Sequence, residues 1–372
     1  ILKELLKLPE GTHTVVLGVG DLNGIMRGKR IPATNWETIC NNGNSLSAAL
    51  FAVDMTCDIW DTPYVNMGNG YPDCHIFPIN QPVAIPWEPG VAITFARAET
   101  MDHKPVPIDP RNALLNQVER AKSMGFDFQV GTEVEFFLLD PETGKPRDHG
   151  IQVYSLDRAA ELEHVIGPIR QQINECGIPI EQSNPEYAAG QVEVNVRYGE
   201  AVQSADRLVM FRSLVKQLAL AHGYQATFMA KPYLDGTGSG LHVHCSILDG
   251  QNQNIFDDGS SIGAANLRHA IGGMLASMDE SMAIFAPNIN SYRRFVPDSF
   301  VPMFPSWSPN NRSTAIRIPA GTHDSRRFEH RVAGADANPY LTMAAVLAGA
   351  HFGIINKLEP PPMVEGAAPL ID

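Results

Sequence analysis

Alternating polar and apolar positions mark several segments of the chain as strands. In QVEVNVRY, the polar residues Gln191, Glu193, Asn195 and Arg197 alternate with valines, so one face of the strand is polar and the other β-branched. GTEVEFF, GLHVHCS and RRFEHR repeat this alternation elsewhere in the chain. The polar face of such a strand is either solvated or the floor of a site.

Segments with apolar residues three and four positions apart predict helices between these strands. The first lies in IDPRNALLNQVERAK, where Asp109 is placed to cap the helix and Pro110 to begin it. Two longer helices are expected near residues 157–176 and 204–223. This succession of strands and helices predicts an α+β fold whose larger part is built round one sheet.

The amino-terminal part has a different pattern. HTVVLGVGD alternates like a strand, but residues 40–78 are rich in Asn, Gly, Asp and aromatic residues without helical periodicity. We expect long irregular loops there, of the kind that carry function or contact a partner. A domain boundary is predicted near residue 100, which gives a small domain of residues 1–100 and a larger one of residues 101–372.

Charge and length exclude some partners. The 372 residues include 28 Lys and Arg against 41 Asp and Glu, a formal net charge of −13, which disfavours nucleic acid or an anionic membrane and suits cations. The apolar run from Leu341 to Ile355 contains Thr342 and His351, and we expect it to be too short and polar to span a bilayer.

The cysteines indicate the compartment. Their number, five, is odd, and none forms a C-x-x-C pair, so neither a disulfide framework nor a zinc finger is predicted. A reducing cytoplasm is the simplest location.

Four short segments carry the candidate chemistry. Each places charged or imidazole side chains on one strand face: Glu133 and Glu135; Glu193; His242 and His244; and Arg327, Glu329 and Arg331. Taken singly, such a segment is more often a solvated sheet face, a polar edge or a surface ion-pair ladder. Four of them, each flanked by apolar residues, instead predict an enclosed sheet or half-barrel. Carboxylates with one or two imidazoles favour Mg²⁺ or Mn²⁺ over zinc, and arginines beside such ions suit phosphoryl transfer.

A glycine-rich segment precedes the histidine strand. In KPYLDGTGSGLHVH, Gly236, Gly238 and Gly240 allow the backbone to approach a small polar substrate closely. The chain has no G-x-x-x-x-G-K-[ST] phosphate loop and no G-x-G-x-x-G fingerprint. If ATP is a substrate, it binds by other means.

Seven motifs together resemble the glutamine synthetase family. They are DLNGIMRGKRIP, GTEVEFF, NPEYAAGQVEVN, KPYLDGTGSGLHVHCS, NSYRRFVP, NRSTAIRIP and RRFEHRVAGADANPY, in the family's order, from about Asp21 to Tyr340. The resemblance implies a small amino-terminal β-grasp domain and a larger catalytic domain with a curved antiparallel half-barrel sheet. It also implies stacked hexameric rings, a dodecamer, with active sites shared between neighbours. Family chains continue past residue 372, so the carboxyl-terminal end is expected to be incomplete.

The resemblance also implies roles for individual residues. The ligands of one metal ion are expected to be Glu135, Glu186 and Glu193, and those of another Glu133, His242 and Glu329, with two or three Mg²⁺ or Mn²⁺ ions per site. The glutamate contacts are expected to be Gly238, Arg294 and Arg331. The ATP and phosphate contacts are expected to be His244, Ser246, Arg312, Arg317 and Arg327. The implied reaction is ATP-dependent phosphorylation of the glutamate γ-carboxylate, followed by attack of a nitrogen nucleophile; Arg294, Arg312 and Arg331 are the expected catalytic arginines.

Departures from the family pattern indicate which nitrogen nucleophile the protein uses. Phe300 stands where ammonia-using members have a flap glutamate, Met67 lies roughly where a loop aspartate is expected, and Thr237 replaces an asparagine beside glutamate. A phenyl ring in place of a carboxylate loses recognition of NH₄⁺ and gains apolar surface for a carbon-bearing amine. The chain thus resembles the branch that makes γ-glutamylamides. Asp298, or Asp54 from a neighbouring subunit, is the candidate base.

The predicted function is therefore a glutamate–amine ligase. Candidate amines are small alkylamines such as methylamine or ethanolamine, and polyamines such as putrescine. Two alternatives stay open: an ordinary glutamine synthetase that uses ammonium, and a catalytically silent ligand sensor on the same fold.

Overall fold

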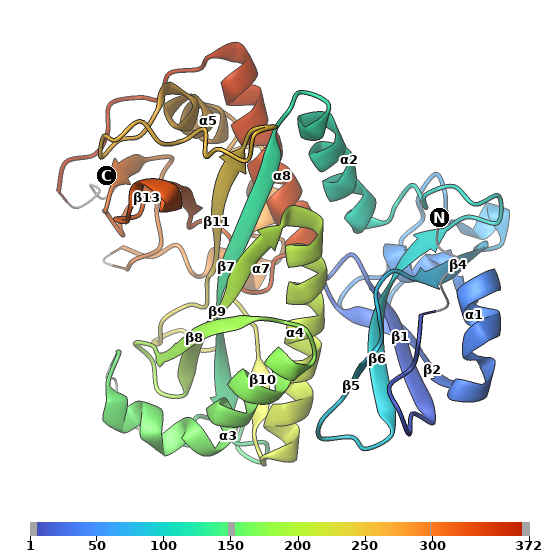
Figure 1. Ribbon diagram of the computed structural model, residues 1–372. Coiled ribbons are helices and arrows are strands. Elements are labelled where there is room, and N and C mark those ends of the chain that lie inside the picture. Colours follow the sequence, from blue (N-terminus) through green and yellow to red (C-terminus); the bar gives the residue numbers. More distant parts are fainter. Residues whose placement is uncertain (1–5, 148–152, 298, 367–372) are drawn as a thin grey trace.

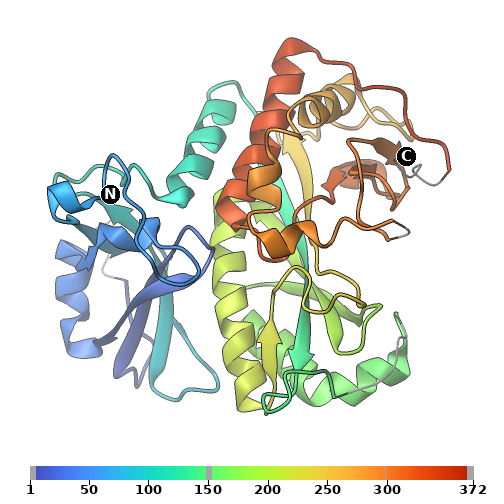
Figure 2. The same ribbon diagram turned by 180° about the vertical axis from the view of Figure 1, so that it is seen from behind.

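The computed structural model describes residues 6–147, 153–297 and 299–366. Figure 1 shows two sheets, with helix α4 (Ala201–Ala221) running between them, and Figure 2 gives the same arrangement from behind. The sequence predicts an α+β fold, and a fold of mixed helices and strands is confirmed. The division into residues 1–100 and 101–372 stays a prediction.

The smaller sheet is amino-terminal and its strand order is β2-β1-β6-β4-β3, with β5 paired to β6. Its strands are β1 (Thr14–Gly20), β2 (Met26–Pro32), β3 (Asn44–Ser47), β4 (Asp73–Pro78), β5 (Val83–Ala84) and β6 (Val91–Glu99). β1 runs antiparallel to β2 and parallel to β6, and helix α1 (Trp36–Asn42) lies against β4. The β-grasp assignment of this unit stays a prediction.

Strand β6 joins the two hydrophobic cores. Ile93 and Phe95 belong to the large core, whereas Ala96 and Ala98 belong to the small amino-terminal one. Side chains of a strand point alternately to its two faces, so β6 buries both. Its nearly continuous apolar sequence, VAITFARAE, follows from this position between cores.

The larger sheet has the order β12-β13-β14-β11-β7-β9-β8, with β10 paired to β7. Its strands are β7 (Asp127–Leu139), β8 (Ile180–Pro185), β9 (Gln191–Glu200), β10 (Gln225–Thr227), β11 (Leu241–Leu248), β12 (Trp307–Pro309), β13 (Ile316–Ile318) and β14 (Phe328–His330). The neighbours are antiparallel except β12 and β13, which run parallel. The prediction of a wholly antiparallel sheet is therefore wrong at the edge formed by β12 and β13.

Helices α2 (Pro110–Lys122) and α3 (Leu156–Glu175) begin within a residue of the predicted positions, whereas α4 begins at Ala201, before the predicted residue 204. Asp109 caps α2 by accepting a hydrogen bond from the backbone N–H of Arg111. The remaining helices are α5 (Ala265–Ala276), α6 (Met282–Phe285), α7 (Ile289–Tyr292) and α8 (Pro339–Asn356). Short 3₁₀ turns cover Ala33–Asn35, Ala48–Ala52, Met67–Asn69 and His323–Ser325.

Two expectations about segments need correction. Residues 40–78 are not continuous loop, because the end of α1, two 3₁₀ turns, β3 and β4 fall within them. Helix α8 does reach the length and apolar composition of a membrane span, contrary to expectation, but 61% of it is buried inside the protein. Its apolar face is therefore explained by packing against α5 and α2. All five cysteines are free thiols.

Candidate active site

Neighbouring strands bring the four polar faces together. In the large sheet β14, β11, β7 and β9 lie in succession, and the register sets His242 opposite Glu133, His244 opposite Glu329, and Glu135 opposite Glu193. Because side chains at paired positions point to the same face of a sheet, the alternation noted in four separate segments becomes one continuous polar surface.

Glu133 is the centre of this surface. Its carboxylate oxygens lie 3.2 Å from His242 Nδ1 and 3.0 Å from His244 Nε2. Burial alone raises the pKa of Glu133, but the hydrogen bonds and charges of the two histidines outweigh burial and hold that pKa well below its usual range. The group is thus a carboxylate at neutral pH, ready to act as a ligand.

In two neighbouring carboxyls the pKa is raised instead of lowered. Burial, and after it repulsion from four other carboxylates, raises the pKa of Glu193 to about 9. Burial and repulsion from Glu135 raise the pKa of Glu186 to about 7. Such repulsion between grouped oxygen ligands is what a divalent cation relieves. The donor set, carboxylates with imidazole, fits Mg²⁺ or Mn²⁺.

The grouping of ligand atoms differs from the expected sets. Among the described residues, the ligand atoms that lie within 4.8 Å of one another are those of Glu133, Glu193 and His242, and those of Glu133, His244 and Glu329. Glu133 is shared between the two groups, and His244, expected to contact ATP, joins one of them. The trio of Glu135, Glu186 and Glu193 is not gathered to that distance.

Glu329 is held between two arginines. Its side chain is fully buried, and it accepts hydrogen bonds from Arg331 Nη1 at 2.5 Å and Arg317 Nη1 at 2.9 Å. Burial acts to raise its pKa, but Arg331 and the nearby histidines lower the pKa of Glu329 to about 2. The ion-pair ladder considered in RRFEHR is therefore a buried, oriented network rather than a solvated one.

A cavity of about 500 Å³ adjoins this surface. It is lined by most of the expected metal and glutamate residues and by one expected ATP contact, namely Glu135, Glu186, Glu193, Gly238, His242, Arg294, Arg312 and Arg331, and also by Phe300. Carboxylates and arginines therefore line the same space, which is large enough for a small substrate.

Gly238 and Arg294 lie close together in the wall of the cavity. A Cβ atom on Gly238 would lie 2.6 Å from Arg294 Cγ and 3.0 Å from the carbonyl oxygen of Ala230, so only glycine fits there. Arg294 is buried and donates Nη1 to the carbonyl of Val332 at 3.0 Å. The Nε atoms of Arg294 and Arg331 have no hydrogen-bond partner among the described residues.

The other expected ATP residues lie further along the sheet. His244, Ser246, Arg317 and Arg327 are outside the described lining of the cavity. Arg327 donates Nε to His244 Nδ1 at 3.1 Å, so these residues form a second part of the polar surface beyond Glu133.

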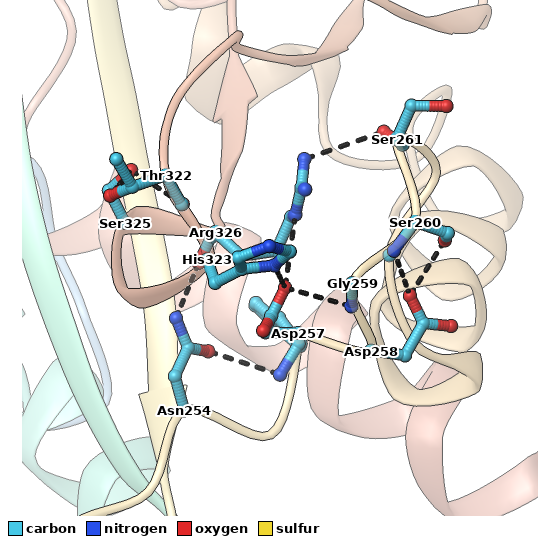
Figure 3. Close-up of polar contacts among 12 residues, drawn as sticks. Asn254, Asp257, Asp258, Gly259, Ser260, Ser261, Thr322, His323, Ser325 and Arg326 are labelled. Atoms are coloured by element: carbon cyan, nitrogen blue, oxygen red, sulfur yellow. Dashed lines mark hydrogen bonds and ion pairs between the residues drawn. The ribbon is translucent and has the colours of Figure 1, made fainter.

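The loop that carries Arg327 is fixed at its base (Figure 3). Asp257 Oδ1 lies 3.1 Å from His323 Nδ1 and 3.7 Å from Arg326 Nε, and Asn254 donates to the carbonyl of Arg326 at 2.8 Å. These contacts tie the turn after β11 to the segment before β14. Arg327 is therefore presented from a backbone that is held on both sides.

Asp54 is not part of the cavity formed by this chain. Its carboxylate accepts hydrogen bonds from the backbone N–H groups of Thr56 at 2.8 Å and Asp58 at 3.0 Å, and from Trp60 Nε1 at 3.2 Å. It thus stabilises a turn within its own chain. The other candidate base, Asp298, lies outside the described residues.

Sequence reasoning missed part of the cavity wall. Tyr187 packs against Phe300 with ring centroids 5.5 Å apart. Gln191, noted only as part of a polar strand face, donates to Glu135 at 3.2 Å and to the Gly238 carbonyl at 3.0 Å, and accepts from Thr237. The signal for Tyr187 was its position directly after Glu186 in NPEYAAG.

Comparison with known proteins agrees with this geometry. The sequence model of the family described as "Glutamine synthetase, catalytic domain" matches residues 107–369. The chain belongs to the glutamine synthetase family. Within it, γ-glutamylputrescine synthetase of Escherichia coli K12 is 34% identical over 98% of this chain and 80% of its own length. Glutamate–isopropylamine ligase of a Pseudomonas species is 31% identical over 98% and 84%.

Glutamine synthetases of the ordinary kind are similar too. That of Thermotoga maritima is 38% identical, over 72% of this chain and 62% of its own. Among solved structures, ligand-free GmaS has a TM-score of 0.84 at 29% identity, covering 96% of this chain and 81% of that one. The predicted resemblance to the glutamine synthetase family, and to its γ-glutamylamide branch, is confirmed.

Proposed function

We propose that this chain joins the γ-carboxylate of glutamate to a carbon-bearing primary amine by way of γ-glutamyl phosphate. The reaction class, ATP-dependent ligation of glutamate to an amine, follows from family membership and from the named activities of its relatives. The amine itself is our proposal: a small alkylamine such as methylamine or ethanolamine, or a polyamine. Relatives named for putrescine and isopropylamine support a donor with carbon atoms.

The observation that carries the proposal is the aromatic pair at the cavity. Tyr187 and Phe300 both line it and pack against each other, and Val296 and Val301 extend the same apolar wall. Binding NH₄⁺ favours a carboxylate beside it, whereas an alkyl group is stabilised by covering apolar rings. An amine with carbon atoms therefore gains more from this wall than ammonium does.

The arginines that line the cavity suit glutamate. Arg294 and Arg331 each have an unpartnered Nε among the described residues, and a guanidinium binds a carboxylate through two parallel hydrogen bonds. We assign them to the carboxylates of glutamate, with Gly238 allowing close backbone approach. Their buried positive charges would also stabilise the negative charge that develops as the acyl phosphate forms.

The carboxylate and imidazole groups are assigned to metal ions. Glu133, Glu193, His242, His244 and Glu329 would hold Mg²⁺ or Mn²⁺ in the two groups described above, and Glu135 and Glu186 would complete the set. Bound ions would offset the charge of ATP phosphates. Ser246, Arg312, Arg317 and Arg327 are assigned to ATP, since all but Arg312 lie on the part of the sheet beyond Glu133.

Assembly completes the proposal. We propose stacked hexameric rings in which the turn at Asp54 meets the cavity of a neighbouring subunit. The exposed side chains of Met55, Ile59 and Trp60 on that turn are suited to burial at such a contact. Light scattering with activity assays tests this, and a fully active monomer would contradict it.

The test of function is phosphate release with ATP, Mg²⁺ and glutamate across ammonium, methylamine, ethanolamine, isopropylamine and putrescine. We expect higher kcat/KM for at least one carbon-bearing amine than for ammonium. Preference for ammonium would return the chain to the ordinary glutamine synthetases. No turnover with any donor, together with tight glutamate binding, would indicate a sensor.

A further inference from the structure

A second cavity lies between α4 and the amino-terminal sheet. Its volume is about 640 Å³, and its walls come from α4, the turn before β2, the segment after β10, and the segments at residues 288–290 and 335–336. Figures 1 and 2 show α4 between the two sheets. The volume is in the range of small-molecule sites, and the residues assigned to glutamate, ATP and metal lie elsewhere.

Positive charge is concentrated in this cavity. Arg212 is 6% exposed; it donates Nη2 to the carbonyl of Ala337 at 2.8 Å, but its Nε has no partner among the described residues. Lys216 lies one helical turn later on α4 and forms no ion pair with any described residue. The ring of Phe228 lies 5.9 Å from the Arg212 guanidinium and 6.0 Å from the Lys216 ammonium.

One oxygen of the carboxylate in the same lining is already engaged. Asp336 Oδ2 accepts hydrogen bonds from Ser291 Oγ at 2.6 Å and Asn288 Nδ2 at 3.0 Å, whereas its buried Oδ1 has no partner among the described residues and its charge acts on Arg212. Arg212, Lys216 and Asp336 are the charged residues of the described lining, which leaves a net charge of +1. A buried guanidinium with a free donor is costly unless an anion meets it.

The rest of the wall is apolar and adaptable. Met26 and Met229 line the cavity together with Phe228, and thioether side chains adjust their shape to varied apolar groups. We propose that this cavity binds a small organic monoanion, a carboxylate on an apolar body, with the carboxylate at Arg212 and Lys216 and the body against the methionines.

A purely structural Arg212 is the competing explanation. Its bond to Ala337 does brace the segment before α8. That role gives no reason for Lys216 to stand beside it, or for the cavity, so a ligand accounts for more of the observations.

The experiment is calorimetric titration of the full chain with phenylacetate, with excess glutamate present to fill the active-site arginines. Phenylacetamide has the same shape without the charge, and acetate has the charge without the apolar body. We expect phenylacetate to bind saturably at millimolar concentration or below, and both analogues to bind at least about tenfold more weakly, because charged hydrogen bonds and apolar burial each contribute that much.

Substitutions in and outside the cavity test whether phenylacetate binds there. Arg212→Lys keeps the charge but removes the forked guanidinium and should weaken phenylacetate binding about tenfold. Lys216→Met, at an exposed position, should fold normally and weaken it about threefold. Lys122→Met removes a lysine from α2, outside this cavity, and should have no effect. The proposal is overturned if phenylacetate does not saturate, if an analogue binds equally, or if both cavity variants bind like wild type.

Discussion

The two sides of the candidate active site are built differently. The charged side stands on four adjacent strands and is buried, with Glu329 fully enclosed by Arg317 and Arg331. The aromatic side stands on loops, and there Tyr187 and Phe300 are 39% and 54% exposed. Rigid strands suit groups that must keep fixed geometry for phosphoryl transfer. Exposed loop residues suit a contact that differs from one amine to another.

If this contrast is correct, changes on the charged side abolish turnover and changes on the aromatic side alter the choice of amine. The largest effect is expected for Glu135→Ala. Glu135 accepts hydrogen bonds from the backbone of Gly240 and from Gln191, so its loss removes a proposed metal ligand and frees the backbone at Gly240. We expect kcat/KM to fall by roughly 100-fold or more with an unchanged circular dichroism spectrum.

The matched control for that variant is Glu181→Ala, which removes an exposed carboxylate from β8. It should retain wild-type activity. If Glu135→Ala keeps a tenth of wild-type activity or more, the assignment of the charged side is wrong.

A buried carboxyl outside the site has a pKa that is raised mainly by burial. Burial raises the pKa of Asp109 to about 7, above its value in the unfolded chain, so the folded state holds a proton that unfolding releases. Stability is therefore greatest below the unfolded pKa and falls as pH rises towards 7. The Asp109→Asn variant keeps a capping side chain but cannot ionise, so it does not lose stability in this way.

Urea unfolding at pH 5 and pH 8 measures the difference. The free energy of unfolding of Asp109→Asn relative to wild type should rise by an amount on the order of 2 kcal/mol between these values. If the variant and wild type differ by the same free energy of unfolding at pH 5 and at pH 8, Asp109 is ionised at both pH values. Activity should not change, in contrast to Glu135→Ala.

On the aromatic side, Phe300→Glu restores a carboxylate at the cavity. We expect the ratio of kcat/KM for ammonium to that for isopropylamine to rise about tenfold, because the carboxylate binds NH₄⁺ and lowers the cost of removing its proton. The ratio is the quantity to measure, since lost stability lowers both values together. Phe300→Leu, which stays apolar, is the control, and the idea fails if the two variants give the same ratio.

Sequence patterns predicted the charged side far better than the aromatic side. Period-two alternation fixes which side chains share a face, so Glu133, Glu193, His242 and Glu329 could be placed on one surface before strand order was known. The grouping of ligand atoms round Glu133 could not be predicted in this way, because it depends on the register between strands that are distant in the chain. Tyr187 escaped notice because loop conformation, which no periodicity encodes, turns it towards Phe300.

The smallest effect is expected for Tyr187→Leu. Leucine keeps apolar surface but loses the ring packed on Phe300, so KM for isopropylamine should rise about threefold while KM for glutamate stays the same. Steady-state kinetics with each substrate varied in turn separates the two constants. An equal rise in both would place Tyr187 in general support of the cavity, not in amine contact.

The most direct measurement is the amine profile of the unaltered protein. With ATP, Mg²⁺ and glutamate saturating, kcat/KM is determined for isopropylamine and ammonium at the same pH. An aromatic wall that receives the carbon chain predicts a value for isopropylamine at least about tenfold above that for ammonium. A value for ammonium equal to or above that for isopropylamine, and above those for methylamine, ethanolamine and putrescine, would contradict it.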